Sequence, residues 1–423
     1  MTDFPKLLRV RQKFPKAVPL DIECELRAQF AACKLLDGLK PGARVAITAG
    51  SRGITHLALL VRSIVELVKA ARCEPFIVPA MGSHGGATPE GQSSILADYG
   101  VTEKSMGAPI RASMETKVLG WTADGVAVHF SVEALSADGI IALNRVKPHT
   151  DFNGGKIASG LMKMIGIGLA KRNGAEACHA AAARLGHERV VLSAARISLA
   201  HAPILGAVGV VENQFHETAL LKVAARADIE ETDALLLQEA RKRMPNLPFG
   251  DVDLLIVDAI GKNISGTGMD TNIVGRGVQG YSSSLIPGEI KPPVIRRLFV
   301  RGLTPQTHGN AAGVGLADFV TTRLVNAIDK HATYINSLTA ITPQLAKIPI
   351  HFDSDREVLQ KAIASLALAP GAAVKCIRIK DTLSMEEVRV SESYAEELKS
   401  RADLETLSAP VGMVFDEAGN LAD

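Results

Sequence analysis

ARVAITAGSRGITHLALLVRSIVELVKAARCEPFIVP, residues 43–79, carries the alternation that decides the fold. Ala43–Ala49 is a short apolar run that predicts a buried strand, and Ile54–Ala71 has apolar residues at helical spacing. Glu74–Pro79 predicts a second short strand. A strand, a helix and a strand in this order are typical of a βαβ unit, which builds a parallel sheet.

The same alternation continues along the chain. The further predicted strands are Asp138–Leu143, Ile204–Glu212, His216–Arg226, Val252–Ala259 and Pro410–Leu421, the last with a turn. The further predicted helices are Pro89–Tyr99, Gly174–Leu185, Glu188–Ala200, Ile229–Met244, Ala311–Asp329 and Ser354–Leu368. The dipeptide Asn173-Gly174 indicates a break between helices.

This pattern predicts an α/β protein with two α/β domains, mostly parallel sheets and an active site in the cleft between the domains. We expect residues 1–268 to form an N-terminal catalytic and cofactor-binding domain, and residues 269–404 to form a C-terminal α/β domain. The glycine-rich stretch Gly261–Gly280 is the predicted junction. A strand within about 405–423 is expected to pack back on the first domain.

The composition excludes several classes of protein. The 423 residues are 47% hydrophobic and 22% charged with a net charge of +2, too balanced to indicate nucleic acid or a membrane surface as a partner. The five cysteines lie far apart and are odd in number, which favours a reducing cytoplasm over a disulfide framework. We find no signal peptide and no apolar run long enough to span a membrane.

Four glycine-rich loops each follow a predicted strand. In parallel sheets, ligands bind beyond the carboxyl ends of the strands, so residues on these loops are expected to converge on one cleft. The loops are Gly50–Gly53, Ala80–Thr88, Asn144–Lys163 and Gly261–Gly280.

Three loop residues carry side chains suited to chemistry. Arg52 stands between a strand and a helix, where a guanidinium and free backbone N–H groups bind anions. His84 is flanked by glycines, which leaves room for a ligand against the backbone. His149 follows Pro148, which fixes the chain before it. Each of the three also has an ordinary alternative as a surface or loop residue.

Lys163 and His179 complete the candidates. Lys163 lies in the apolar stretch SGLMKMIGIG, where a lysine is costly unless it is paired or used covalently. A desolvated lysine amine can be neutral and act as a nucleophile. His179 follows Cys178 in an Ala-rich predicted helix and is either a satisfied helix histidine or a metal ligand. The phosphate-loop, Rossmann, HExxH and GxSxG templates do not fit the chain.

With these motifs in this order, the chain resembles the nickel-dependent lactate racemase superfamily. Within it, the chain is most similar to a divergent, malate racemase-like member. The match runs through GSRG, GSHGGAT, KPHTDFNGGKIASGLMK, CH and GMDTNIVGR, over roughly residues 40–280. The resemblance implies a 2-hydroxyacid racemase or epimerase with a nickel pincer nucleotide, a pyridinium mononucleotide with two sulfur-bearing arms. It implies that hydride moves from the substrate to the cofactor and back while two histidines alternate as acid and base.

Carried onto this chain, the resemblance makes His84 and His149 the catalytic pair and His179 the nickel ligand. It makes Lys163 the lysine joined to the cofactor, with Lys156 as a rival for that bond. Arg276 and Arg52 stand where the substrate carboxylate is bound. The implied cofactor-binding residues are Ser51, Arg52, Gly53, Gly160 and Lys163.

The substrate stays open among lactate, malate and a sugar acid. Arg145, Lys147 and Lys156 are cations that would suit the second carboxylate of malate. Three other functions stay open: an NAD-dependent 2-hydroxy acid dehydrogenase, a non-catalytic nucleotide- or anion-binding protein, and a zinc hydrolase. The expected partner is a small 2-hydroxy acid, and the sequence leaves the oligomeric state open.

Overall fold

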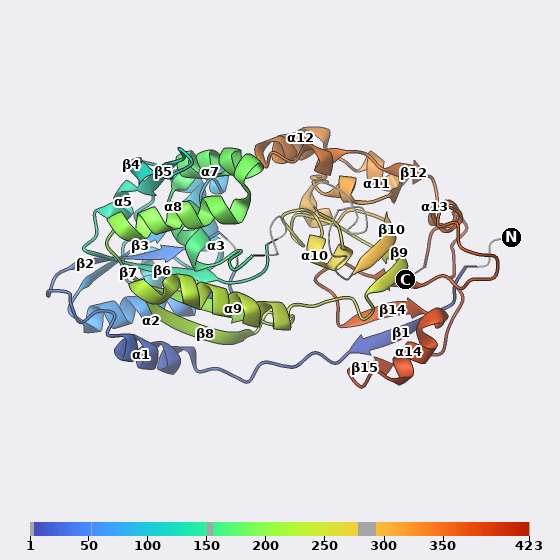
Figure 1. Cartoon of the computed structure of the whole chain (residues 1–423), viewed down its shortest axis with the longest axis horizontal. Coiled ribbons are helices and arrows are strands. Elements are labelled where there is room, and N and C mark those ends of the chain that lie inside the picture. Colours follow the sequence, from blue (N-terminus) through green and yellow to red (C-terminus); the bar gives the residue numbers. More distant parts are fainter. Residues whose placement is uncertain (1–3, 52, 150–154, 278–292, 423) are drawn as a thin grey trace. The chain divides into compact units, whose positions relative to one another are not determined.

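The computed structural model describes residues 4–51, 53–149, 155–277 and 293–422, which form two compact units (Figure 1). The N-terminal unit is Lys16–Met244. The C-terminal unit consists of Pro245–Asp423 together with Met1–Pro15. The chain therefore divides at Met244, ahead of the junction that the sequence predicts at Gly261–Gly280.

Strand pairing explains this difference. Strand β9 (Asp251–Val257), expected in the first domain, pairs with β10 (Val294–Val300) and β13 (Cys376–Ile379) inside the C-terminal unit. The first strand, β1 (Leu7–Gln12), pairs with β14 (Glu387–Ser391) and β15 (Leu404–Thr406) in the same sheet. The C-terminal segment thus packs within the C-terminal unit, and chain order alone does not show such pairings.

The N-terminal unit is built on a five-stranded sheet in the order β3-β2-β6-β7-β8. Its first four strands are parallel, and β8 is antiparallel to β7. The strands are β2 (Arg44–Ala49), β3 (Glu74–Pro79), β6 (Gly139–Arg145), β7 (Ile204–Glu212) and β8 (Thr218–Ala225), with a separate hairpin of β4 (Thr116–Trp121) and β5 (Ala127–Ser131). The mostly parallel α/β fold is confirmed.

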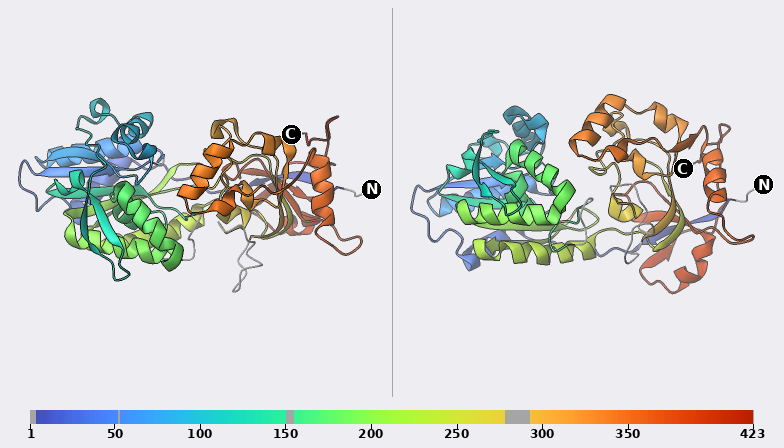
Figure 2. Two further views of the ribbon diagram at one scale, coloured as in Figure 1. Left: turned by 90° about the horizontal axis from the view of Figure 1, so that it is seen from above. Right: turned by 45° about the horizontal axis from the view of Figure 1, so that its top comes forward.

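Helices cover both faces of this sheet. One apolar core joins α1, α2 and α3 to the strands, and a second core on the other face joins α7, α8 and α9, with α7 and α8 side by side (Figure 1 and Figure 2). The helical segments are α1 (Ile22–Cys33), α2 (Leu57–Ala70), α3 (Pro89–Asp98), α4 (Glu103–Met106), α5 (Val132–Leu135), α6 (Leu161–Lys163), the π-helical turn η2 (Met164–Gly168), α7 (Lys171–Leu185), α8 (His187–His201) and α9 (Ile229–Arg243).

Local sequence explains where α3 begins, whereas α7 continues through a dipeptide that predicted a break. Thr88 caps α3 by accepting the N–H of Gly91, and Pro89 occupies the first turn, where a missing N–H costs nothing. Helix α7 begins at Lys171, so Asn173-Gly174 lies inside it and the predicted break is wrong. Asn173 instead donates its side-chain amide to the Thr116 hydroxyl of β4 at 3.0 Å, a tertiary contact that the dipeptide does not reveal.

The C-terminal unit has an eight-stranded sheet in the order β12-β11-β10-β9-β13-β14-β1-β15. Its remaining strands are β11 (Phe319–Thr321) and β12 (Ile350–Phe352), and its described helices are α10 (Thr271–Val274), α11 (Thr322–Asn326), α12 (Lys330–Thr339), α13 (Asp355–Ala364) and α14 (Ala395–Lys399). The single helix predicted over Ala311–Asp329 is wrong. Strand β11 interrupts it, because Phe319–Thr321 pairs with β10 and β12.

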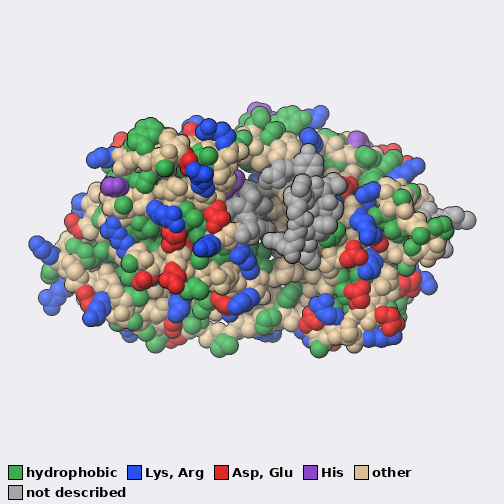
Figure 3. Space-filling view, in the orientation of Figure 1, with side chains coloured by type: hydrophobic (Ala, Val, Ile, Leu, Met, Phe, Trp, Pro, Cys, Tyr) green, Lys and Arg blue, Asp and Glu red, His purple; other side chains and the backbone are tan. Residues whose placement is uncertain are grey.

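Charged side chains of both signs are interspersed over the face of the molecule that Figure 3 shows. Within the described ranges, we find no helix that combines the length and the apolarity needed to cross a bilayer.

Candidate active site

Three of the four predicted loops of the sequence leave the same edge of the N-terminal sheet. Strands β3, β2 and β6 are parallel neighbours, so Ser51, the loop from Ala80 to His84, and the segment from Val146 to His149 all follow carboxyl ends. This is the edge at which parallel sheets bind ligands. The fourth loop, at Gly261, belongs to the C-terminal unit.

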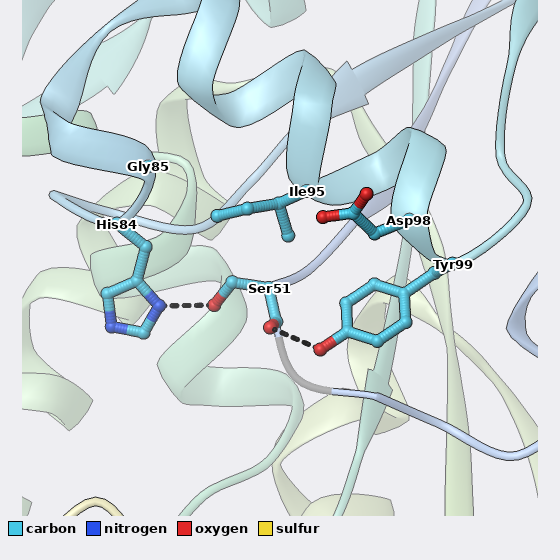
Figure 4. A pocket seen from close by; sticks show the side chains of 6 residues that line it. All are labelled: Ser51, His84, Gly85, Ile95, Asp98 and Tyr99. Carbon is cyan, nitrogen blue, oxygen red and sulfur yellow. Dashed lines mark hydrogen bonds between the residues drawn. The ribbon is translucent and has the colours of Figure 1, made fainter. Parts of the chain in front are cut away.

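His84 is an exposed side chain held by Ser51. The Ser51 hydroxyl forms a hydrogen bond with Nδ1 of His84, and the Tyr99 hydroxyl donates to the backbone oxygen of Ser51 at 3.3 Å (Figure 4). The hydroxyl can donate or accept, so this contact persists in either imidazole tautomer. Ser51, expected to bind the cofactor, thus also orients the predicted catalytic histidine.

A pocket of about 420 Å³ lies beside His84. Its lining residues are Ser51, His84, Gly85, Ile95, Asp98 and Tyr99 (Figure 4). The lining offers an imidazole, hydroxyl groups, a carboxylate and one aliphatic side chain. It therefore suits a small molecule with hydroxyl groups, which can donate hydrogen bonds to a carboxylate.

His149 and Lys163 are in contact. Nζ of Lys163 lies 2.6 Å from Nε2 of His149, and both side chains are partly buried. An ammonium can only donate, so next to a charged Lys163 the ring of His149 accepts at Nε2 and carries its proton at Nδ1. The structure thus brings together the second predicted catalytic histidine and the predicted tethering lysine.

His179 and His187 extend this cluster. The ring centroid of His187 lies 6.1 Å from that of His179 and 6.3 Å from that of His149. His179 is on α7, and His187 is the first residue of α8. His187 is not among the site residues predicted from the sequence. Its nearness to His179 depends on the turn at Gly186 between the two helices, and no local motif marks it.

A buried carboxylate caps the short helix that carries Lys163. Asp233 on α9 is fully buried and accepts the N–H groups of Leu161 and Met162 at 2.9 and 3.0 Å, which caps the short helix α6. Burial raises the pKa of Asp233 to about 6, although these two hydrogen bonds act to lower it. At Gly160 a Cβ atom would lie 2.0 Å from Asp233 Oδ1, so the helix cap requires glycine there.

The π-helical turn η2 connects Lys163 to the loop that carries His84. Gly82 donates its N–H to the oxygen of Gly168 at 3.2 Å. A Cβ atom at Gly168 would lie 2.8 Å from the oxygen of Ala80, so glycine allows this close approach. Short π-helical segments are frequent at functional sites. The glycines that stand out in the sequence therefore join two loops of the site.

Lys171 is the desolvated lysine of this region. We expected that property of Lys163, which is only partly buried, whereas Lys171 has an exposed fraction of 0%. Its Nζ donates to the oxygen of Pro79 at 2.6 Å and to Oε1 of Gln92 at 3.2 Å. Burial lowers the pKa of Lys171 to about 8, against an opposing effect of Glu133.

Other predicted residues have different surroundings. Arg145 forms an ion pair with Glu212, which also accepts the N–H of Thr55 at 2.6 Å. Lys156 is exposed, and Gly53 faces the ring of Tyr99. Arg52 lies outside the described residues.

Arg276 lies in the C-terminal unit and is buried. It donates to the oxygen of Ile295 at 2.7 Å and to the carboxylate of Asp318 at 2.8 Å. Its role as a substrate cation stays a prediction.

In the part of the chain that the structure describes, there is no group of three or more His, Cys, Asp or Glu side chains that could hold a metal ion. A metal that needs three or four protein ligands therefore has no cage among these residues. A metal that brings its other donors with it needs one imidazole, and the partly buried His179 can supply that imidazole.

Comparison with known proteins agrees with this architecture. Residues 17–190 match the family model of the lactate racemase N-terminal domain, a range that includes Ser51, His84, His149, Lys163 and His179. No curated protein sequence matches the chain significantly.

Among solved structures, the fold is similar to the lactate racemase apoprotein from Thermoanaerobacterium thermosaccharolyticum, with 14% identity and a TM-score of 0.50. That match covers 89% of this chain and 99% of the other. The chain is therefore similar to the lactate racemase N-terminal domain over residues 17–190 and to a lactate racemase apoprotein in its fold.

Proposed function

We propose that the protein is a 2-hydroxyacid racemase or epimerase in which His84 and His149 alternate as acid and base. The observation that carries this proposal is the placement of two oriented imidazoles on loops at one sheet edge, in a lactate racemase N-terminal domain. Ser51 orients His84, and Lys163 contacts Nε2 of His149. A pair of histidines suits inversion at a carbon atom, because one can take a proton where the other later returns one.

The proposed cofactor is a nickel pincer nucleotide held by His179 and joined to Lys163. When bound, this group supplies a hydride acceptor for the 2-carbon of the substrate. The chain's own part is to hold the metal with one imidazole, to bind the substrate, and to move the hydroxyl proton through His84 or His149. A single histidine ligand fits the described residues, which contain no larger group of metal ligands.

The substrate is a small 2-hydroxy acid, and the surroundings of the site argue against malate. Arg145, one of the cations that would bind a second carboxylate, is paired with Glu212. Asp98 adds a carboxylate to the pocket beside His84, where a second anionic group would be repelled. We therefore favour a substrate with a neutral or hydroxylated tail, such as lactate or a sugar acid.

The test uses protein co-produced with the cofactor pathway and a chiral assay over lactate, malate and aldonates. His84→Ala and His149→Ala should each lower turnover about 100-fold or more, the usual contribution of a general acid or base. The double variant should abolish turnover with nickel still bound. His201→Ala, at an exposed histidine of α8, is the matched control and should keep full activity.

Retained turnover in the double variant would contradict the assignment, and net oxidation with free NAD would instead indicate a dehydrogenase. Lys163→Ala should remove any covalent adduct from the intact mass. An unchanged adduct mass would move the bond to Lys156.

A further inference from the structure

Lys171 is a buried cation whose two hydrogen-bond partners are neutral. Its ammonium contacts the backbone oxygen of Pro79 at the end of β3 and the side-chain oxygen of Gln92 on α3. A buried charge without an opposite charge is costly, and a methionine of similar length would fill the same space without that cost. The lysine is therefore expected to do something that an apolar side chain cannot do.

Gln92 forms hydrogen bonds both with Lys171 and with the loop that carries His84. Its side chain is fully buried, and Nε2 donates to the oxygens of Gly82 and His84 at 3.0 and 3.3 Å. An ammonium has no acceptor, so Oε1 of Gln92 must face Lys171 and Nε2 must face the two carbonyl groups. The three residues form one directed chain of hydrogen bonds, from Lys171 through Gln92 to the backbone of His84.

The loop needs such support because its backbone is permissive. Gly82, Gly85 and Gly86 have φ angles of 58°, 66° and 64°, and Ala87 follows at 55°. Glycine populates these conformations easily but loses more conformational freedom than other residues when it is fixed. His84 itself is exposed, so packing of its side chain does little to hold it.

We propose that Lys171 and Gln92 are positioning residues that fix the backbone of Gly82–His84 and thereby the imidazole of His84. The catalytic part of this proposal rests on the proposed function. Lys171 is the first residue of α7, the helix that carries His179, and it follows the turn after Lys163, so the same contact joins the His84 loop to the segment between Lys163 and His179. Lys171 thereby fixes the position of the His84 loop relative to the segment from Lys163 to His179.

Hydrogen–deuterium exchange of the cofactor-free protein tests the structural part. Lys171→Met and Gln92→Glu should each speed exchange of the amides in residues 81–92 roughly tenfold, as expected when a hydrogen bond to a charged or buried group is lost. Gln92→Glu keeps an acceptor for Lys171 but cannot donate to the loop, so it separates anchoring of α7 from positioning of His84. Ile64→Ala, on α2 in the apolar core that also contains Met81 and Leu96, is the control for general destabilisation.

Faster exchange confined to 81–92 in both variants supports the proposal. Unchanged exchange in 81–92 overturns it, as does acceleration spread over the whole unit in the manner of Ile64→Ala. In cofactor-loaded protein, both variants should lower kcat about tenfold or more with KM little changed, since the substrate still binds but His84 is misplaced. If the loop loosens while the loaded wild type racemises no 2-hydroxy acid, the positioning role stands and the proposed function fails.

Discussion

Asp355 in the C-terminal unit and Lys171 in the N-terminal unit are both fully buried charged residues, but their surroundings differ. In the C-terminal unit, the fully buried Asp355 accepts hydrogen bonds from Arg301 and Arg323 at 2.8 and 2.6 Å. In the N-terminal unit, the equally buried Lys171 donates to a backbone oxygen and to the neutral amide of Gln92. The hydrogen-bond partners of Asp355 include opposite charges, whereas those of Lys171 are neutral.

The effect on the pKa differs accordingly. Burial alone would lower the pKa of Arg301, but Asp258 and Asp355 together raise it above its ordinary value. Burial lowers the pKa of Lys171, and the opposing effect of Glu133 does not restore it. The ion pairs of Asp355 therefore hold segments of the C-terminal unit together, whereas the hydrogen bonds of Lys171 go to neutral groups beside the candidate site.

The paired network fastens the end of the chain. Asp355 accepts the N–H of Leu421 at 2.9 Å, Arg301 donates to the oxygen of Leu421, and Arg378 donates to the oxygen of Ala422. These contacts explain why the C-terminal segment packs within its own unit. Among the variants considered below, loss of Asp355 is therefore expected to have the largest effect on stability.

Asp355→Ala should lower the free energy of unfolding of the C-terminal unit by about 3 kcal/mol, because the buried Arg301 loses one of its two carboxylate partners and the N–H of Leu421 loses its acceptor. Urea unfolding measures the change. Asp353→Ala, at an exposed neighbour, is the matched control and should cost less than about 1 kcal/mol. A loss as small in Asp355→Ala as in this control would show that the network is neutral for stability.

Lys171 should make stability depend on alkaline pH. The pKa falls from 10.5 in the unfolded chain to about 8 in the folded protein, so between these values the unfolded chain holds a proton that the folded protein has released. The free energy of unfolding should then rise from pH 8 to 10.5 by up to about 3 kcal/mol. In Lys171→Met this rise should be missing. If the free energy of unfolding of the two proteins depends on pH in the same way, the lowered pKa of Lys171 is contradicted.

Asp233 should give a smaller effect of opposite direction in acid. Its pKa rises from 3.8 to about 6 in the folded protein, which therefore holds a proton that the unfolded chain has lost between these values. The free energy of unfolding should fall by about 2–3 kcal/mol as the pH rises from 4 to 6. Thermal unfolding of wild type and Asp233→Asn measures this slope, and a slope that persists unchanged in the variant would assign it to other groups.

Part of the site could be predicted from the sequence. His84, His149 and Lys163 stand in glycine-rich segments after apolar strands, and such loops meet at one edge of a parallel sheet. The contact of Ser51 with His84 joins two of these loops, whereas Lys163 contacts His149 within a third, and the roles of these residues stay predictions. Motif order, hydrophobic period and strand direction are local properties, and they were enough for these residues.

The remaining residues of the site depend on contacts between distant segments. Lys171 lies in GLAKRNG at the start of an amphipathic helix, a position where a lysine is usually solvated. Only the packing of α7 against Pro79 and Gln92 buries it. Arg145 was expected to be available to a substrate, but it meets Glu212 because β6 and β7 are neighbours in the sheet.

The sequence by itself determined the α/β class, the parallel order of the first strands and the loops that carry the candidate histidines, because these follow from the period of apolar residues and from glycine. The tertiary structure alone decided the division at Met244, the pairing of β1 with the last strands and the burial of Lys171 rather than Lys163. Burial and strand pairing join residues far apart in the chain, and so they leave no mark in any single stretch of it.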